Sequence, residues 1–222
     1  MEKALDPAAK GKDWRDSKTW YMHETLVLRV ARVIVRSIVH RYARVEAEGF
    51  ENLPGGPCVL ACNHLSNADV LYMATALPRH PYYMAKIELF QNPVMAWFYR
   101  KCGAFPVYRG ENDGWVIEQA GKILAQGKML AIFPEGRRSK TRQLLPAKVG
   151  AVRLAARYKV PVVPMAIWGT EWLFKKGGPS SRARTVHLAV GPPIDLIEVV
   201  SPPYNYKSYQ GLITVVMKAI AA

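Results

Sequence analysis

The sequence predicts an α/β domain with a mostly parallel central sheet flanked by helices, preceded by an amphipathic helix. Short apolar runs alternate with segments of helical period along most of the chain. The run at residues 58–62 is apolar throughout, as in a strand buried on both faces. Half of the 222 residues are apolar and 10% are aromatic, which excludes disorder as the overall state. We expect residues 1–40 to form a lead-in with the amphipathic helix, and residues 41–222 to form one domain.

The amphipathic helix is predicted over residues 17–39. On a helical wheel, Arg29, Arg32 and Arg36 fall on one narrow stripe, and apolar residues cover most of the remaining surface. A basic stripe beside a wide apolar face is typical of a helix lying in a membrane interface, with its arginines at the headgroups. A helix that packs on the core and exposes one face to solvent fits the same pattern equally well.

The elements that follow are assigned from period, length and turn residues. Strands are expected where short apolar or alternating runs occur, at residues 42–47, 58–62, 82–85, 104–107, 129–133, 162–167 and 185–190. Helices are expected where the apolar period lengthens, at residues 68–77, 89–101, 115–126, 147–158 and 209–220. Ligands in such folds bind beyond the carboxyl ends of the strands.

The charge balance suggests an anionic partner. Lys and Arg number 31 against 17 Asp and Glu, a net charge of +14, which favours nucleic acid, a membrane surface or a phosphorylated substrate. No apolar run reaches the ~18 residues of a spanning helix. The first twenty residues lack the apolar region of a signal peptide. Three cysteines without a framework spacing fit a reducing cytosol.

Two motifs follow predicted strands. Residues 63–69, Asn-His-Leu-Ser-Asn-Ala-Asp, set His64 and Asp69 five apart across a strand-to-helix turn. This spacing can place a carboxylate on one imidazole nitrogen and leave the other free as a general base, or it can be a local cap. Residues 133–139, Phe-Pro-Glu-Gly-Arg-Arg-Ser, pair a glycine with two arginines suited to phosphate, or form a solvated basic loop. Lys86 follows the strand at 82–85 and either faces the same cleft or is a solvated surface lysine.

Together these motifs resemble the glycerophosphate acyltransferase superfamily, in particular the 1-acylglycerol-3-phosphate acyltransferases. Four blocks of the family occur in order: Asn-His-x4-Asp at 63–69, Gly-Ala-Phe-Pro-Val-Tyr-Arg at 103–109, the 133–139 motif, and Val-Pro-Val-Val-Pro at 160–164. The resemblance spans about residues 42–170. One departure is Arg137, which stands where the family usually has threonine, so the family arginine aligns with Arg138 and Arg137 is an extra charge.

The resemblance implies roles for named residues. His64 is the expected general base and Asp69 its orienting partner. The residues expected to bind substrate, mainly the acceptor phosphate, come from these blocks: Asn63, Gly103, Arg109, Glu135, Gly136, Arg137 and Arg138. Lys148, in Lys-Val-Gly, resembles the family's basic residue after the 133–139 loop and is expected to bind with them. Transfer of a fatty acyl group from acyl-CoA or acyl carrier protein to lysophosphatidic acid is the expected reaction, without metal or cofactor. An enzyme acting on this lipid is expected at an anionic membrane surface, peripheral to the cytoplasmic face, where Arg29, Arg32 and Arg36 would contact the bilayer.

Other functions fit less of the sequence. A serine hydrolase would need a Gly-x-Ser-x-Gly elbow, and a nucleotide-binding enzyme a glycine-rich phosphate loop, and neither motif occurs. Cys58, Cys62 and His64 make a poor zinc site because the cysteines fall in a buried strand and no fourth ligand is evident. Transfer to another lysolipid or a glycolipid stays open. A non-catalytic domain binding anionic lipid or nucleic acid would explain the charge but not the His64–Asp69 spacing, and no nucleic-acid partner is expected.

Overall fold

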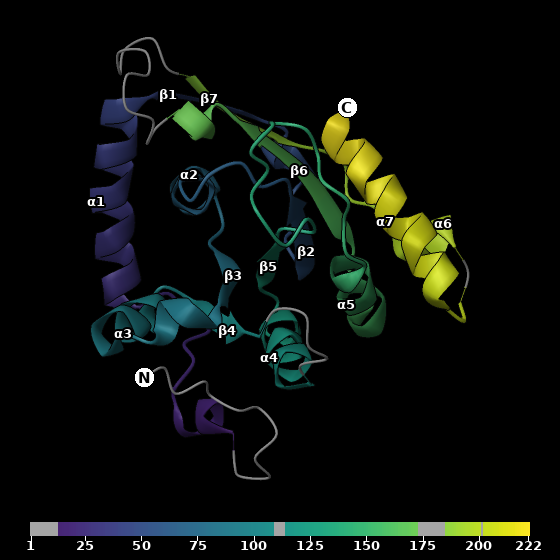
Figure 1. Cartoon of the computed structure of the whole chain (residues 1–222), viewed down its shortest axis with the longest axis horizontal. Helices are drawn as coiled ribbons and strands as arrows, with labels where there is room; N and C mark the ends of the chain where they lie inside the picture. The colour runs from purple at the N-terminus through teal and green to yellow at the C-terminus, as the bar shows by residue number, and fades with distance from the viewer. Residues whose placement is uncertain (1–12, 109–113, 173–184, 201) are drawn as a thin grey trace.

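The computed structural model describes residues 13–108, 114–172, 185–200 and 202–222. In these residues seven strands form one sheet in the order β1-β7-β6-β2-β5-β3-β4 (Figure 1). The strands are β1 (Arg44–Glu48), β2 (Cys58–Cys62), β3 (Pro81–Lys86), β4 (Ala104–Val107), β5 (Met129–Ile132), β6 (Val162–Trp168) and β7 (Thr185–Val190). All neighbours are parallel except β6 and β7. The predicted α/β class with a mostly parallel sheet is therefore confirmed.

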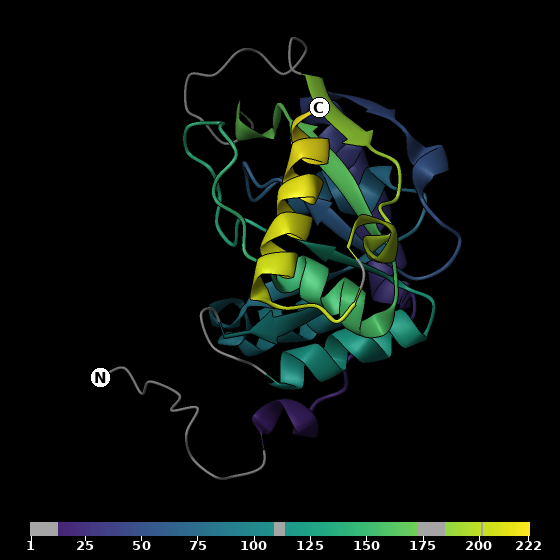
Figure 2. The same cartoon turned by 90° about the vertical axis from the view of Figure 1, so that its right-hand side faces the viewer.

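Helices cover both faces of the sheet. One face carries α1 (Leu26–Tyr42), α2 (Asp69–Ala76) and α3 (Pro93–Lys101); the other carries α4 (Gly114–Ala125), α5 (Gly150–Tyr158), α7 (Tyr206–Ala221) and the short α6 (Leu196–Val199) (Figures 1 and 2). Strand β2 explains why both faces need cover. Its alternate residues enter two cores, Leu60 on the α2 side and Val59 and Ala61 on the α5 side, and all are fully buried.

Local caps set helix boundaries that the hydrophobic period misses. The first helix begins at Leu26 rather than near residue 17, because the Thr25 hydroxyl accepts a hydrogen bond of 3.0 Å from the Leu28 amide. The expected helix at 89–101 is divided into a 3-10 turn, Ile87–Phe90, and α3. Asn92 caps α3 by accepting from the amides of Val94 and Met95, and Pro93 occupies its first turn.

The order of the strands positions the candidate site. β2 lies in the centre between β5 and β6, and all three run parallel. The segments leaving their carboxyl ends therefore meet at one edge of the sheet, and each of the three contributes to the site described next.

Candidate active site

The candidate site is centred on the turn between β2 and α2. The His64 Nδ1 atom lies 2.7 Å from Oδ2 of Asp69, the first residue of α2. Asp69 is fully buried, and the His64 side chain is 13% exposed. Nε2 of His64 has no hydrogen-bond partner in the described part of the chain. The expected pairing is present, and it leaves one ring nitrogen open to accept a proton.

Asp69 is held by more than the histidine. Its Oδ2 also accepts hydrogen bonds from the amides of Leu65 (2.8 Å) and Ser66 (2.9 Å), and Oδ1 accepts one of 2.5 Å from the Thr170 hydroxyl. Four donors surround a carboxylate with no access to water, which is how a buried charge is made tolerable. The arrangement fixes both the carboxylate and the imidazole that bonds to it.

The loop after β5 closes over the same turn. Phe133 stacks on the His64 ring, with centroids 4.0 Å apart and planes 18° from parallel. Glu135, which is buried, accepts hydrogen bonds from the amides of His64 and Leu145, both 2.9 Å long. The Ser139 amide donates to the His64 carbonyl over 2.7 Å. Both Glu135 oxygens are thus occupied by backbone amides, which gives this residue a role in joining the loop to the turn.

Asn63 makes a comparable link on the other side of β2. Its Nδ2 donates to the Ile167 carbonyl (2.8 Å) and its Oδ1 accepts from the Ile167 amide (2.7 Å), tying the end of β2 to β6. Asn63 is itself buried. Both ends of its side-chain amide therefore help to hold the sheet edge next to His64.

Most of the cationic residues predicted to bind phosphate lie on the loop after β5, and Lys86 lies at the end of another strand. Arg137, Arg138 and Lys148 are exposed on the loop that contacts the His64 turn. Gly136 has a positive φ of 67°, and a Cβ there would lie 3.5 Å from the Lys148 side chain, so backbone conformation more than space favours glycine. Lys86 ends β3 at the same edge of the sheet, paired with Val107.

Two residues of the predicted 103–109 block are placed differently. Gly103 precedes β4, so it lies at the amino edge, the opposite edge from His64. Glycine is favoured at this position because its φ is 75° and because a Cβ there would lie 2.9 Å from the Tyr82 ring. The structure does not bring Gly103 to the His64 turn. Arg109 lies outside the described residues.

The three predicted membrane-contacting arginines of α1 differ in exposure. Arg29 and Arg36 are exposed, whereas the Arg32 side chain is 25% exposed and donates to the Leu77 carbonyl over 3.2 Å. Helix α1 also exposes large apolar side chains along its length: Leu26, Val30, Val33, Ile34 and Ile38. Within the described ranges, no helix has both the length and the apolar character needed to cross a membrane.

The two cysteines of β2 are buried, Cys62 at the end of the strand next to the site and Cys58 at its start. Burial, reinforced by the charges of Asp69 and Glu135, raises the pKa of Cys62 well above its usual value, and burial raises the pKa of Cys58 to about 11. In the part of the chain that the structure describes, no three His, Cys, Asp or Glu side chains are grouped as metal ligands would be.

Thr170 and Phe133 are the contacts of the site that the motifs alone do not assign. Thr170 follows β6, the neighbour of β2 in the sheet, and is fully buried. Because parallel neighbours end at one edge, a hydroxyl just beyond β6 is a natural partner for a group just beyond β2. The adjacent Glu171 pairs with Arg142 over 3.2 Å, which links this segment to the loop after β5.

A family model described as Acyltransferase matches residues 44–168, which is more than half of the chain and includes His64, Asp69 and the loop after β5. The chain belongs to this acyltransferase family.

Several curated relatives carry the name 1-acyl-sn-glycerol-3-phosphate acyltransferase. The Bacillus subtilis protein is 41% identical over 132 residues, covering 57% of this chain and 65% of that protein. The human alpha form is 31% identical over 148 residues, covering 63% and 51%. The matched part of the chain thus spans less than two thirds of these relatives.

A solved structure supports the fold of this acyltransferase-family chain. The 1-acyl-sn-glycerophosphate acyltransferase PlsC of Thermotoga maritima superposes with a TM-score of 0.68 at 24% identity, covering 87% of this chain and 78% of that one.

Proposed function

We propose that the protein transfers a fatty acyl group from a thioester, acyl-CoA or acyl carrier protein, to the free hydroxyl of 1-acylglycerol-3-phosphate, forming phosphatidic acid. The observation that carries the proposal is the His64–Asp69 pair, 2.7 Å apart at the carboxyl edge, with the second imidazole nitrogen open. The names of the relatives agree with this reaction.

His64 Nε2 acts as the general base. It takes the proton of the acceptor hydroxyl as the oxygen attacks the thioester carbonyl; the carbon–sulfur bond then breaks, and the imidazolium returns its proton to the departing thiolate. Asp69 keeps the Nδ1–H tautomer and stabilises the imidazolium. General-base assistance of this type contributes ~10²–10⁴ in rate. The thioester is already activated, so the reaction needs no covalent enzyme intermediate, metal or cofactor.

The acceptor phosphate binds to cations of the loop after β5. Arg138 and Lys148 are exposed beside the His64 turn, Arg137 adds a charge, and Lys86 ends a neighbouring strand at the same edge. Guanidinium groups suit phosphate because they donate paired hydrogen bonds in one plane. Arg109 is assigned to the same phosphate by family resemblance. Asn63, Glu135 and Gly136 shape this edge and its loop rather than touch substrate, and Gly103 shapes the turn before β4 at the opposite edge.

Acyl transfer is tested with radiolabelled acyl-CoA and acyl carrier protein, each offered with a panel of lysolipid and glycolipid acceptors, and with products separated by chromatography. We expect label in phosphatidic acid with at least one donor. Acylation of another lysolipid, with none of 1-acylglycerol-3-phosphate, would overturn the acceptor assignment and leave the His64 chemistry intact. Label that stays on the protein through denaturation would argue against direct attack.

The protein works at an anionic membrane surface, with the apolar side of α1 on the bilayer. Val30 and Ile34, one helical turn apart, are 49% and 53% exposed, and Trp97 on the neighbouring α3 is 46% exposed. Large apolar side chains grouped on one face mark an interaction surface. Arg29 and Arg36 extend from the same helix, and arginine near anionic headgroups contributes ~1 kcal/mol.

Vesicle sedimentation tests this attachment. The double variant Val30→Asp/Ile34→Asp should no longer sediment with anionic vesicles. The control variant Ile197→Asp changes an apolar residue of α6 that is 54% exposed, and it should sediment with the vesicles as wild type does. Equal binding by all three proteins would refute attachment through α1.

A further inference from the structure

We propose that the cavity between α1 and α2 binds the phosphate of an anionic phospholipid, as a headgroup site separate from the acyl-transfer site. The cavity is lined by Arg29, Arg32, Val33, Arg36 and Thr75, and its volume of about 230 Å³ suits a headgroup, being smaller than the ~300–1,000 Å³ of sites that enclose a drug-sized ligand.

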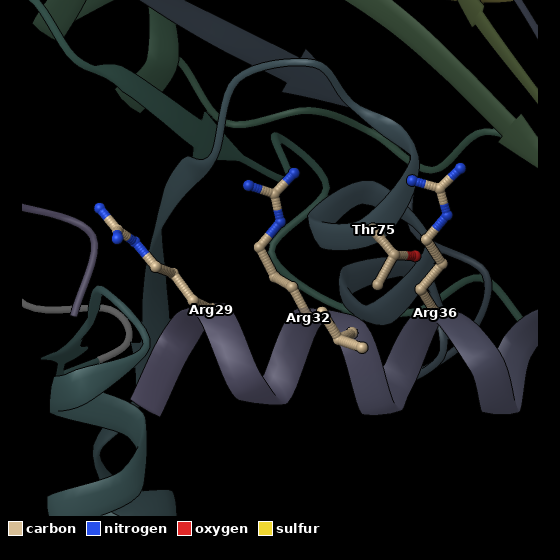
Figure 3. Close-up of a pocket in the computed structure, with 5 residues that line it drawn as sticks. Arg29, Arg32, Arg36 and Thr75 are labelled. Atoms are coloured by element: carbon tan, nitrogen blue, oxygen red, sulfur yellow. The ribbon is translucent and has the colours of Figure 1, made fainter. Parts of the chain in front are cut away.

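The three arginines that line this cavity stand in a row along α1 (Figure 3). They extend from one side of α1, with Thr75 of α2 between Arg32 and Arg36 and with Arg29 pointing away from these two (Figure 3). Their spacings of three and four residues place like charges on one helix face, which is unfavourable without an anion. The Thr75 hydroxyl donates to the Leu71 carbonyl over 2.8 Å, so this residue lines the cavity without offering a free donor. The hydrogen-bond donors to a bound phosphate are therefore the arginines.

The described residues supply too little negative charge to neutralise these three arginines. Glu24 lies 3.3 Å from Arg32 and 3.8 Å from Arg29, and its side chain is 43% exposed. Arg36 has no ion pair or hydrogen bond with any residue in the described ranges. One carboxylate therefore serves two of the three cations and leaves Arg36 without a counter-charge among the described residues. A phosphate beside Thr75 would accept paired hydrogen bonds from Arg36 while Arg32 stays on the Leu77 carbonyl.

A lipid is favoured over a free phosphate ion by what surrounds the cavity. Val33, part of the lining, is 67% exposed, and Ile34 beside it is 53% exposed. A headgroup held by the arginines would have its acyl chains next to these apolar side chains. Thr75 lies six residues along α2 from Asp69, about 9 Å at 1.5 Å per residue, which separates this cavity from the His64 pair.

The test measures binding, so its outcome is independent of the acyl-transfer proposal. Wild type, Arg36→Gln, Arg41→Gln and Glu24→Gln are sedimented with phosphatidylcholine vesicles containing phosphatidic acid, at fixed ionic strength. Arg41 is the matched control because it is exposed on the same helix and does not line the cavity. Circular dichroism and thermal melting establish that each variant is folded.

We expect Arg36→Gln to weaken vesicle binding on the order of tenfold, as for a lost charge-assisted hydrogen bond, and Arg41→Gln by about fivefold at most. Glu24→Gln should strengthen binding by up to about fivefold, because it removes the competing carboxylate. Equal losses for Arg36→Gln and Arg41→Gln would overturn the proposal in favour of diffuse electrostatic attraction. Calorimetry with inorganic phosphate separates the sources: saturable binding lost only in Arg36→Gln, without a difference on vesicles, would assign a free ion and overturn the headgroup.

Discussion

Two histidines stand at opposite ends of α2 and at opposite edges of the sheet. His64 precedes the helix at the carboxyl edge, with Nδ1 on the Asp69 carboxylate and Nε2 open. His80 follows the helix at the amino edge, where Nε2 lies 3.1 Å from the Cys102 carbonyl and Nδ1 is buried without a partner among the described residues. Both rings are largely out of water, so burial alone does not distinguish them.

The hydrogen-bond partners of the two histidine rings distinguish them. A carboxylate on one nitrogen stabilises a protonated ring, so His64 can accept a proton at its free nitrogen. His80 faces a neutral carbonyl, and burial lowers its pKa to about 4, so its neutral form is the stable one. The first arrangement suits proton transfer and the second suits packing, which is why the two rings should respond differently to substitution.

Replacing His64 should produce the largest effect. His64→Ala removes the base and should reduce acyl transfer by ~10²–10⁴ with the fold retained, as measured by initial rates and circular dichroism. His80→Gln, the matched control, should keep most of the activity at pH 7. If His64→Ala keeps a tenth of wild-type turnover, the contrast between the two histidines has no catalytic meaning.

The next largest effect is expected at the phosphate loop. Arg138→Ala should reduce kcat/KM for lysophosphatidic acid by ~10–150-fold, the equivalent of ~1.5–3 kcal/mol for a lost charged hydrogen bond, with little change in the acyl-donor KM. Arg137→Ala should be milder, because this residue replaces the family threonine. Equal losses for the two variants, or a loss confined to the donor, would contradict the assignment.

The sequence indicates the His64 pair but not the network around it. His64 and Asp69 are close along the chain, so spacing and family blocks suffice to identify them. Thr170 donates to Asp69 from 101 positions away, and a single threonine carries no motif. Glu135 and Gly103 belong to family blocks, yet only the fold shows that one bonds backbone amides and the other turns the chain beside Tyr82. The strand ranges can be predicted from the sequence because the apolar period reports burial, whereas the helix starts depend on the caps at Thr25 and Asn92.

The lowered pKa of His80 predicts how the stability of the folded protein depends on pH. Its pKa is about 4 in the folded protein against 6.5 ordinarily, so the unfolded chain binds more protons between these values. Stability from the neutral ring is complete above pH 6.5 and falls as pH drops toward 4, by about 2 kcal/mol between pH 7 and pH 5. Urea unfolding at both pH values should show that decrease in wild type and a smaller one in His80→Gln. An unchanged acid dependence in the variant would mean that His80 does not set it.

The smallest effect is expected from Thr170, which acts on His64 only through Asp69. Its hydroxyl is one of four donors to the carboxylate, so Thr170→Val leaves three and should loosen the pair without removing it. We expect kcat to fall about fivefold, the ~1 kcal/mol of one net hydrogen bond, with KM for both substrates unchanged. Thr170→Ser keeps the hydroxyl and should restore kcat. A threonine that only packs would give the opposite pattern: Thr170→Ser, which loses the methyl group, would lower the melting temperature, and Thr170→Val, which keeps it, would leave kcat unchanged.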